Sequence, residues 1–452
     1  MNKNYWKKFI FWLVTTPVLI FSVFLAVLYW NQDTIVQELI DTVNEDFEGA
    51  VVIEESRISP FESFPYVSID LEGVKIYPDK LKTGSQLLNV EDMYLGFNIW
   101  DLFLAAPKIQ SLKIKNGFVK LVQHKDGSFN ITNALTSRKQ IESINTEFNL
   151  NLSSIQLTNI DLIKLNEENN VLLDFFVKEA QFKFKSSPNH VMVALESKFK
   201  LSIVVEDDTT FIKNKHFDVK TQLDYKSDEQ LLVIQPSVLA VERALFRMKG
   251  SVDIDNDMEL DIQLEGEKPN FDLFLAFAPE ELTPLLQRYE NGGEVYFRTT
   301  VKGKSINGHN PTIDADFGCE QAFFDNRVSH KKLDELFFKG HFTNGSQRNA
   351  STMEFSLEDV SAKPDVGIFS GSLHVRNFQS PEIDLKIRSE FELDFLANFL
   401  NLTELQDLKG SVALTMNFHD IVDLTQPEKS IEKVNESYFT ELEVKNLSFR
   451  MP

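Results

Sequence analysis

The stretch SFPYVSIDLEGVKIYPD, residues 63–79, alternates apolar with polar side chains and changes phase once. Apolar side chains occupy the odd positions from Val67 to Leu71 and the even positions after Gly73, beginning with Val74. Strict alternation is typical of a β-strand with one dry and one solvated face, and a glycine at a phase change suits either a bulge or a turn. The stretch therefore predicts a one-faced strand whose dry face must contact something.

The same period-two alternation recurs along most of the chain. It is clearest in LKIKNGFVKLV (112–122), SIQLTNIDLIKL (154–165), AQFKFK (180–185), FRMKGSVDID (246–255), MELDIQL (258–264), EIDLKIRSEFEL (382–393) and SVALTMNF (411–418). Turn pairs such as Asn344-Gly345 separate several of these runs, as antiparallel hairpins require. Helical pattern is confined to the start of the chain and to short inserts near 99–105, 271–290 and 394–408, with no βαβ alternation. We therefore predict a mainly β fold built from an antiparallel sheet of about two dozen strands.

Charge and composition restrict the classes of partner that the protein is expected to bind. The 452 residues include 46 basic and 68 acidic side chains, a formal net charge of -22 that would repel nucleic acid. The 39 Phe side chains, against 9 Tyr and 4 Trp, supply apolar rings without hydroxyl groups, which suits contact with hydrocarbon as well as an ordinary core. Cys319 has no second cysteine to pair with, so we expect a small buried hydrophobe.

The N-terminus predicts a membrane anchor. Residues 9–30 carry no charge and supply about the 20 apolar positions that a membrane-spanning helix needs. A signal peptide is the alternative, but this segment ends in bulky Tyr29 and Trp30 where a cleavage site needs small residues. The basic residues of the tail at 1–8 place the N-terminus in the cytoplasm and the bulk of the chain in the periplasm, because positive charge stays inside. Residues 31–49 follow as an amphipathic helix.

An internal repeat organises the second half of the chain. Two strand-like runs, a short helical insert and another strand occur from residue 246 onward, and the same order recurs from residue 367. Gly250 corresponds to Gly371, and Gly293 corresponds to Gly410. Repetition of one supersecondary unit favours an elongated architecture that grows along an axis. The regions that we predict are 50–235 (N-terminal), 236–310 (repeat unit 1), 311–365 (connecting strands) and 366–452 (repeat unit 2 with the C-terminal strands).

No catalytic or metal-binding motif stands out. The eight histidines show neither HxxxH nor HExxH spacing, there is no GxSxG, and the Gly-Lys-Ser at 303–305 lacks the first glycine of a phosphate loop. We therefore expect no enzyme activity, no catalytic residue, no cofactor and no metal.

The first 130 residues resemble the AsmA family of Gram-negative envelope proteins. The resemblance rests on the apolar N-terminal segment, DFEG at 46–49, ISPFESFPYVSIDLEGVKIYP at 58–78 and VEDMYLGFNIWDLFLAAPKIQSLKIKNGFVKLVQHKDGSFN at 90–130. The Phe- and Asn-rich composition would fit a member from the Bacteroidota. The family is related to bridge-like lipid transfer proteins, so the resemblance implies a repeating β-groove: a curved antiparallel half-barrel with short helical inserts, preceded by one transmembrane helix. It also implies a role in outer-membrane biogenesis.

Together, the residues and the resemblance predict an inner-membrane-anchored periplasmic protein that binds phospholipid acyl chains and aids lipid transport to the outer membrane. The alternative is an envelope scaffold or assembly factor that regulates protein targeting to that membrane, with envelope assembly proteins as partners. A third possibility is a closed β-sandwich that binds a soluble ligand. The residues predicted to line the groove are Val67, Ile69, Leu71, Leu112, Ile114, Phe182, Phe184, Val252, Ile254, Leu260, Ile262, Leu264, Val295 and Phe297.

Overall fold

A computed structural model describes most of the chain beyond residue 47. The described residues are 48–59, 66–82, 84–98, 109–125, 128–131, 152–167, 170–205, 208–209, 212–276, 287–306, 308–401, 406–421 and 438–450, with isolated positions at 30, 37, 41 and 284. The chain divides into two compact units. Unit 1 comprises residues 1–188 and 192–210, and unit 2 comprises residues 189–191 and 211–452.

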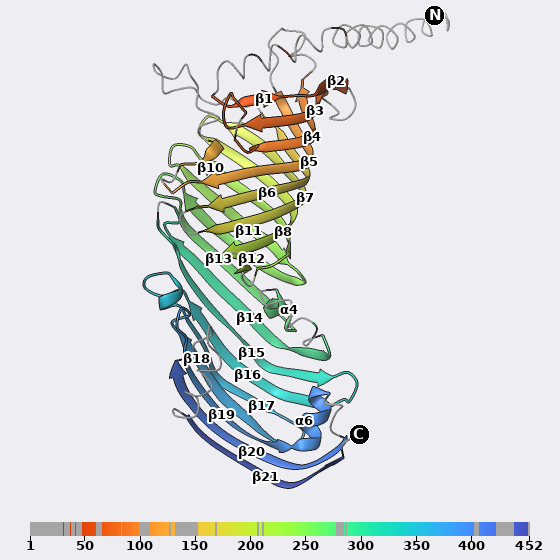
Figure 1. Cartoon of the computed structure of the whole chain (residues 1–452), viewed down its shortest axis with the longest axis vertical. Coiled ribbons are helices and arrows are strands. Elements are labelled where there is room, and N and C mark those ends of the chain that lie inside the picture. Colours follow the sequence, from red (N-terminus) through yellow and green to blue (C-terminus); the bar gives the residue numbers. More distant parts are fainter. Residues whose placement is uncertain are drawn as a thin grey trace, which may run out of the picture. The chain divides into compact units, whose positions relative to one another are not determined.

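Unit 1 is an open sheet of one-faced strands (Figure 1). Its strands are β1 (Ala50–Val52), β2 (Glu55–Ser59), β3 (Val67–Tyr77), β4 (Leu88–Phe97), β5 (Ile109–Gln123), β6 (Ser154–Asn166), β7 (Val171–Ser187), β8 (His190–Val205) and β9 (Asp208–Thr209). The strands β1 to β7 pair antiparallel as predicted, as do β8 and β9, except that β5 and β6 run parallel. A parallel neighbour needs a long connection, and the 30 residues from 124 to 153 between these strands supply one.

Gly73 is neither a turn nor a one-strand bulge. It lies inside β3 with φ +62°, and Leu71 and Val74 on either side of it pair with Met93 and Val90 of β4 in one unbroken register. Both Leu71 and Val74 are nonetheless buried in the same hydrophobic cluster. The left-handed conformation of Gly73 thus exchanges the faces to which the following side chains point, without an extra residue in either strand.

The same exchange of faces crosses the neighbouring strands at the same level. Asn116 of β5 and Asn159 of β6 each have φ near +52°. The strand registers place Gly73 opposite Glu91, Glu91 opposite Asn116 and Asn116 beside Asn159, so the four residues form one row across the sheet. Asn116 Nδ2 donates to Glu91 Oε2 at 2.9 Å, and Asn159 Nδ2 donates to Asn116 Oδ1 at 3.1 Å. Because every strand changes phase together, all of their apolar side chains stay on one face.

Replacing Gly73 by Val is expected to destabilise unit 1 by about 1–2 kcal/mol, since a β-branched residue tolerates positive φ poorly. The matched control is Gly73→Asn, because asparagine already occupies this conformation at positions 116 and 159. The three atoms nearest a new Cβ belong to the Glu54 side chain, the closest at 2.5 Å, and that exposed side chain can move aside. Urea unfolding measures the difference in stability between the two variants. Equal unfolding midpoints would contradict the need for a residue that tolerates positive φ at position 73.

Unit 2 contains the remaining strands and both described helices (Figure 1). Its elements are β10 (Lys215–Lys226), β11 (Leu231–Val241), β12 (Ala244–Asp253), β13 (Glu259–Lys268), α4 (Asp272–Leu275), β14 (Tyr289–Gly303), β15 (Thr312–Asn326), β16 (Lys332–Thr343), the 3-10 turn η2 (Ala350–Thr352), β17 (Glu354–Lys363), β18 (Gly367–Arg376), β19 (Glu382–Glu392), α6 (Leu393–Leu400), β20 (Gln406–Ile421) and β21 (Tyr438–Arg450). From β10 to β21, each strand pairs antiparallel with the next one in sequence.

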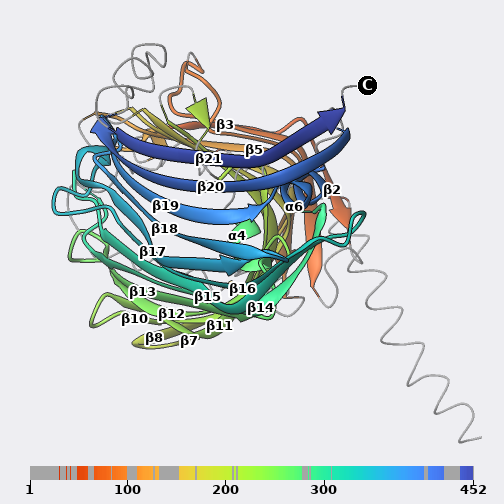
Figure 2. The same ribbon diagram turned by 90° about the horizontal axis from the view of Figure 1, so that it is seen from below.

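The sequence repeat corresponds to a structural order that occurs twice. In the first copy β12, β13, α4 and β14 follow one another, and in the second copy β18, β19, α6 and β20 do so. Each helix connects the end of the second strand to the start of the third. Both helices therefore emerge at the same lateral edge of the sheet, and Figure 2 shows α4 and α6 on the concave side of the curved strands β14–β20.

Three predicted segments fall largely or wholly outside the described residues. These are the anchor at 9–30, with the amphipathic helix at 31–49 after it, and the helical insert near 99–105. Within the part of the chain that is described, no helix has both the length and the apolar character needed to cross a membrane.

Candidate functional site

One face of unit 2 is apolar across its strands, as the register shows. Residues directly opposite each other on paired strands share a face, and a single row joins Phe297, Phe317, Leu357, Leu373 and Leu385 from β14 to β19. We call this surface the apolar face. Its side chains from β12 to β20 include Val252, Leu260, Ile262, Leu264, Val295, Phe297, Val301, Ile313, Phe317, Phe338, Phe342, Phe355, Leu357, Leu373, Val375, Ile383, Leu385, Ile387, Met416 and Phe418.

Helix α4 covers one margin of the apolar face. Its Leu273 is fully buried in a cluster with Phe246, Val295 and Cys319. The ring of Phe271, just before the helix, lies 4.6 Å from the ring of Phe324. This margin is an ordinary hydrophobic core.

Helix α6 covers a second area at the same lateral edge. The ring of its Phe399 lies 4.8 Å from that of Tyr289, and Phe395 is buried. Asn326 fixes the end of the helix by donating Nδ2 to the carbonyl oxygen of Phe399 at 2.7 Å. The Tyr289 hydroxyl donates to the same carbonyl at 3.0 Å. These two hydrogen bonds thus hold the amphipathic helix α6 at the margin of the apolar face.

The rest of the apolar face stays partly accessible. Ile262, Phe342, Leu373, Leu385 and Phe418 are each of intermediate exposure, although their pairing places them well inside the sheet. A strand centre facing a packed core is normally buried, so this band has no full protein cover among the described residues. The apolar face therefore combines a covered margin with an open band.

Glycines let aromatic rings lie flat across neighbouring strands of this face. A Cβ on Gly340 would lie 2.2 Å from the Phe317 ring, and one on Gly266 would lie 2.8 Å from the Phe246 ring. The missing side chain leaves room for the ring, which in turn shields the bare backbone of the glycine. Such pairs smooth the face and favour its curvature.

The unit 1 residues predicted to line a groove do gather on one face. Val67, Ile69, Leu71 and Ile114 are buried. The last three belong to one hydrophobic cluster, against which Leu112 and Phe182 pack. Phe184 is half-buried with its ring 6.4 Å from that of Phe182. In unit 1 these residues form a packed core layer.

The unit 2 residues predicted to line the groove divide into three groups. Val252, Leu260, Ile262, Leu264 and Phe297 lie on the apolar face as expected from the period. Val295 shares that face but is 2% exposed because α4 covers it. Ile254 lies outside the face: it follows the last residue of β12, in the turn before β13, and is exposed. The alternation continues by chance into this turn, so the sequence period did not reveal the strand end.

Sequence reasoning overlooked the half of the apolar face that lies beyond β14. Phe342, Phe355, Leu373 and Leu385 have the same period as the predicted residues and lie on the same face. The run EIDLKIRSEFEL carried this signal, since Ile383, Leu385 and Ile387 alternate with charged residues. Extending the period through the connecting strands and the second repeat would have found all four residues.

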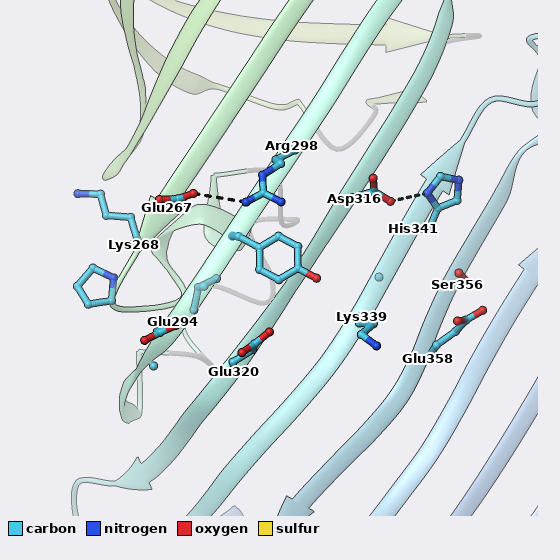
Figure 3. A pocket seen from close by; sticks show the side chains of 15 residues that line it. Glu267, Lys268, Glu294, Arg298, Asp316, Glu320, Lys339, His341, Ser356 and Glu358 are labelled. Atoms are coloured by element: carbon cyan, nitrogen blue, oxygen red, sulfur yellow. Dashed lines mark hydrogen bonds and ion pairs between the residues drawn. The ribbon is translucent and has the colours of Figure 1, made fainter.

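The opposite face of unit 2 is polar and holds a broad depression (Figure 3). Its volume is about 1130 Å³, and the lining includes Arg298, Asp316, Lys339 and His341 from β14, β15 and β16. Burial raises the pKa of Tyr296, whose hydroxyl lies against Gly318. This polar depression is separate in character from the apolar face and is unsuited to hydrocarbon.

Cys319 behaves as the small buried hydrophobe that the sequence predicts. It is fully buried beneath α4, and burial raises the pKa of its thiol to about 12. Because the thiolate is the nucleophile, we expect no alkylation by iodoacetamide in the native protein at about pH 8 and complete alkylation in urea. Intact-mass spectrometry follows the reaction. Rapid labelling of the folded chain would show that the α4 margin opens.

Comparison with protein-family models and with curated proteins finds no match for this chain.

Proposed function

We propose that the protein binds phospholipid acyl chains along the apolar face and aids their transport through the cell envelope. The observation that carries this proposal is the open band, in which large apolar side chains remain half-exposed across many consecutive strands. Extended exposed apolar surfaces on soluble domains mark sites for protein, membrane or ligand. A continuous band with a solvated margin suits a ligand that has long apolar tails and a polar head.

Energetics favour such a surface as a transfer path. Exposing one acyl methylene to water costs about 0.8 kcal/mol, so a two-chain lipid with on the order of 30 methylenes faces a barrier above 20 kcal/mol. A track that keeps the tails dry removes most of this barrier, while the head group stays in water. No specific head-group contact is required.

The proposal also includes a location, which rests on the membrane anchor predicted from the sequence. An apolar segment at 9–30, preceded by basic residues, would hold the chain in the inner membrane with both units in the periplasm. Lipid extracted there would pass along the apolar face toward the outer membrane. The sequence and the resemblance to the AsmA family support this proposed location.

Native mass spectrometry of the full chain, purified in mild detergent, tests the proposal. We expect co-purified phospholipid bound to the folded protein and displaced by added phospholipid of defined chain length. A protein that carries no lipid, and gains none when mixed with phospholipid vesicles, would overturn it.

The exposed edge strand β21 favours a second function, that of an envelope scaffold. Among the described strands only β20 pairs with β21, and Leu442, Val444 and Phe449 are each at least 43% exposed. An unpaired strand edge can accept a strand of another protein by β-augmentation. Photo-crosslinks from Leu442 to envelope assembly proteins, retained when the open band is disrupted by Leu373→Asp, would support the scaffold over lipid transport.

A further inference from the structure

A row of charged and histidine side chains crosses the polar face of unit 2. Its members lie directly opposite one another on successive strands from β12 to β20. The row runs Arg247, Glu265, Arg298, Asp316, His341, Ser356, His374, Asp384 and His419. Three of the eight histidines thus share one level of one face, which their spacing in the sequence does not reveal.

Two carboxylates flank the ring of His341. Nδ1 lies 2.9 Å from Asp316 Oδ1, and Nε2 lies 3.6 Å from Asp314 Oδ2 (Figure 3 shows the Asp316 contact). Asp314 and Asp316 are two positions apart on β15 and therefore project from the same face. One ligand atom from each of the three side chains lies within 4.8 Å of the others.

The neighbouring basic side chains are engaged elsewhere. Arg298 stands opposite Asp316 in the register, but its guanidinium lies 3.5 Å from Glu267. Lys339 Nζ lies 3.3 Å from Asp359. Two carboxylates and an imidazole therefore lie together at the rim of the polar depression.

The other histidines of the row lack this arrangement. His374 has one carboxylate partner, Glu358, at 3.7 Å. His419 lies beside Glu382 and Asp384, but Arg376 Nη2 already lies 3.2 Å and 2.9 Å from those carboxylates. A third carboxylate group, Asp70 with its neighbours in unit 1, holds Arg57 in the same way. In both of these groups an arginine guanidinium already pairs with the carboxylates.

We propose that Asp314, Asp316 and His341 bind a divalent transition-metal ion such as Zn²⁺. Imidazole with carboxylate oxygen suits zinc and its neighbours in the first transition row, whereas Ca²⁺ and Mg²⁺ prefer oxygen alone. Only one ring nitrogen of His341 can bind the ion. Nδ1 and Asp316 Oδ1, 2.9 Å apart, already have about the separation of two ligand atoms on one such ion. Rotation of these partly exposed side chains completes the geometry.

Three protein ligands leave coordination positions free. Asp316 and His341 form part of the lining of the polar depression, so the site lies at its rim. Water fills the free positions in the simplest case, and an anionic group such as a phosphate can replace it. The site lies on the face opposite the open band and does not depend on lipid binding there.

Cobalt titration of the full chain, purified in detergent and stripped with a chelator, tests the site. Co²⁺ bound to mixed nitrogen and oxygen ligands absorbs visible light, and Zn²⁺ should displace it. We expect His341→Ala and Asp314→Asn each to weaken Co²⁺ binding by at least about tenfold. The matched control, His374→Ala, removes a histidine from the same row and should leave the affinity unchanged.

Two results would overturn the proposal. One is the absence of cobalt absorption in the wild-type chain at about 1 mM Co²⁺, well above the range of a functional site. The other is equal binding by the wild type and His341→Ala, which would place the ion elsewhere. Circular dichroism of each variant excludes loss of fold as the cause.

Discussion

Replacing Leu273 by Asp is expected to unfold unit 2. Leu273 is fully buried between Phe246 and Val295 and anchors α4 to the sheet. Losing its apolar contacts alone costs about 2–5 kcal/mol, and the buried carboxylate adds a desolvation cost of several kcal/mol. The sum is comparable with the whole free energy of unfolding of a typical domain.

The matched control for Leu273→Asp is Leu245→Asp. Leu245 precedes Phe246 on β12 and is 49% exposed on the opposite face, so the same substitution should change stability by less than about 1 kcal/mol. Urea unfolding followed by circular dichroism measures both. Equal midpoints for the two variants would show that α4 does not stabilise the apolar face.

The double substitution Ile262→Asp with Leu373→Asp is expected to reduce co-purified lipid at least about tenfold. Both side chains lie in the open band and are only half-buried, so the charges remain solvated and the fold persists. An acyl chain crossing two carboxylates loses apolar contact with several methylenes, and about 1.4 kcal/mol suffices for a tenfold change in binding.

The control for this loss uses the adjacent residues. Gln263 and Ser372 follow and precede the substituted positions on the same strands and point to the polar face. The double variant Gln263→Asp with Ser372→Asp adds the same charge and should keep the wild-type lipid content in native mass spectrometry. Equal lipid in both double variants would contradict binding at the open band.

The period of the side chains predicted the strands and the order of the repeat well. FRMKGSVDID and GIFSGSLHVR correspond to β12 and β18, and α4 and α6 lie in the predicted inserts. Alternation is a local property that one strand expresses by itself, which explains why a single sequence shows it. The alternation did not reveal that β12 ends before Ile254, because the same pattern continues into the turn.

Other features were visible in the sequence but needed the register to be understood. Asn116 and Asn159 interrupt the alternation in their strands as Gly73 does in β3, yet nothing in the separate strands shows that these positions align. The fold depends on that alignment, because one strand out of phase would turn its apolar side chains to the wrong face.

The sequence by itself determined that the strands have one apolar face and that the strand, strand, helix, strand unit occurs twice. Only the tertiary structure decided which part of that face α4 and α6 cover, and that Asp314 and Asp316 meet His341 of the next strand. Periodicity fixes the direction of a side chain relative to its own backbone. Cover and contact depend on residues far apart in the chain, which only the pairing of strands and the docking of helices bring together.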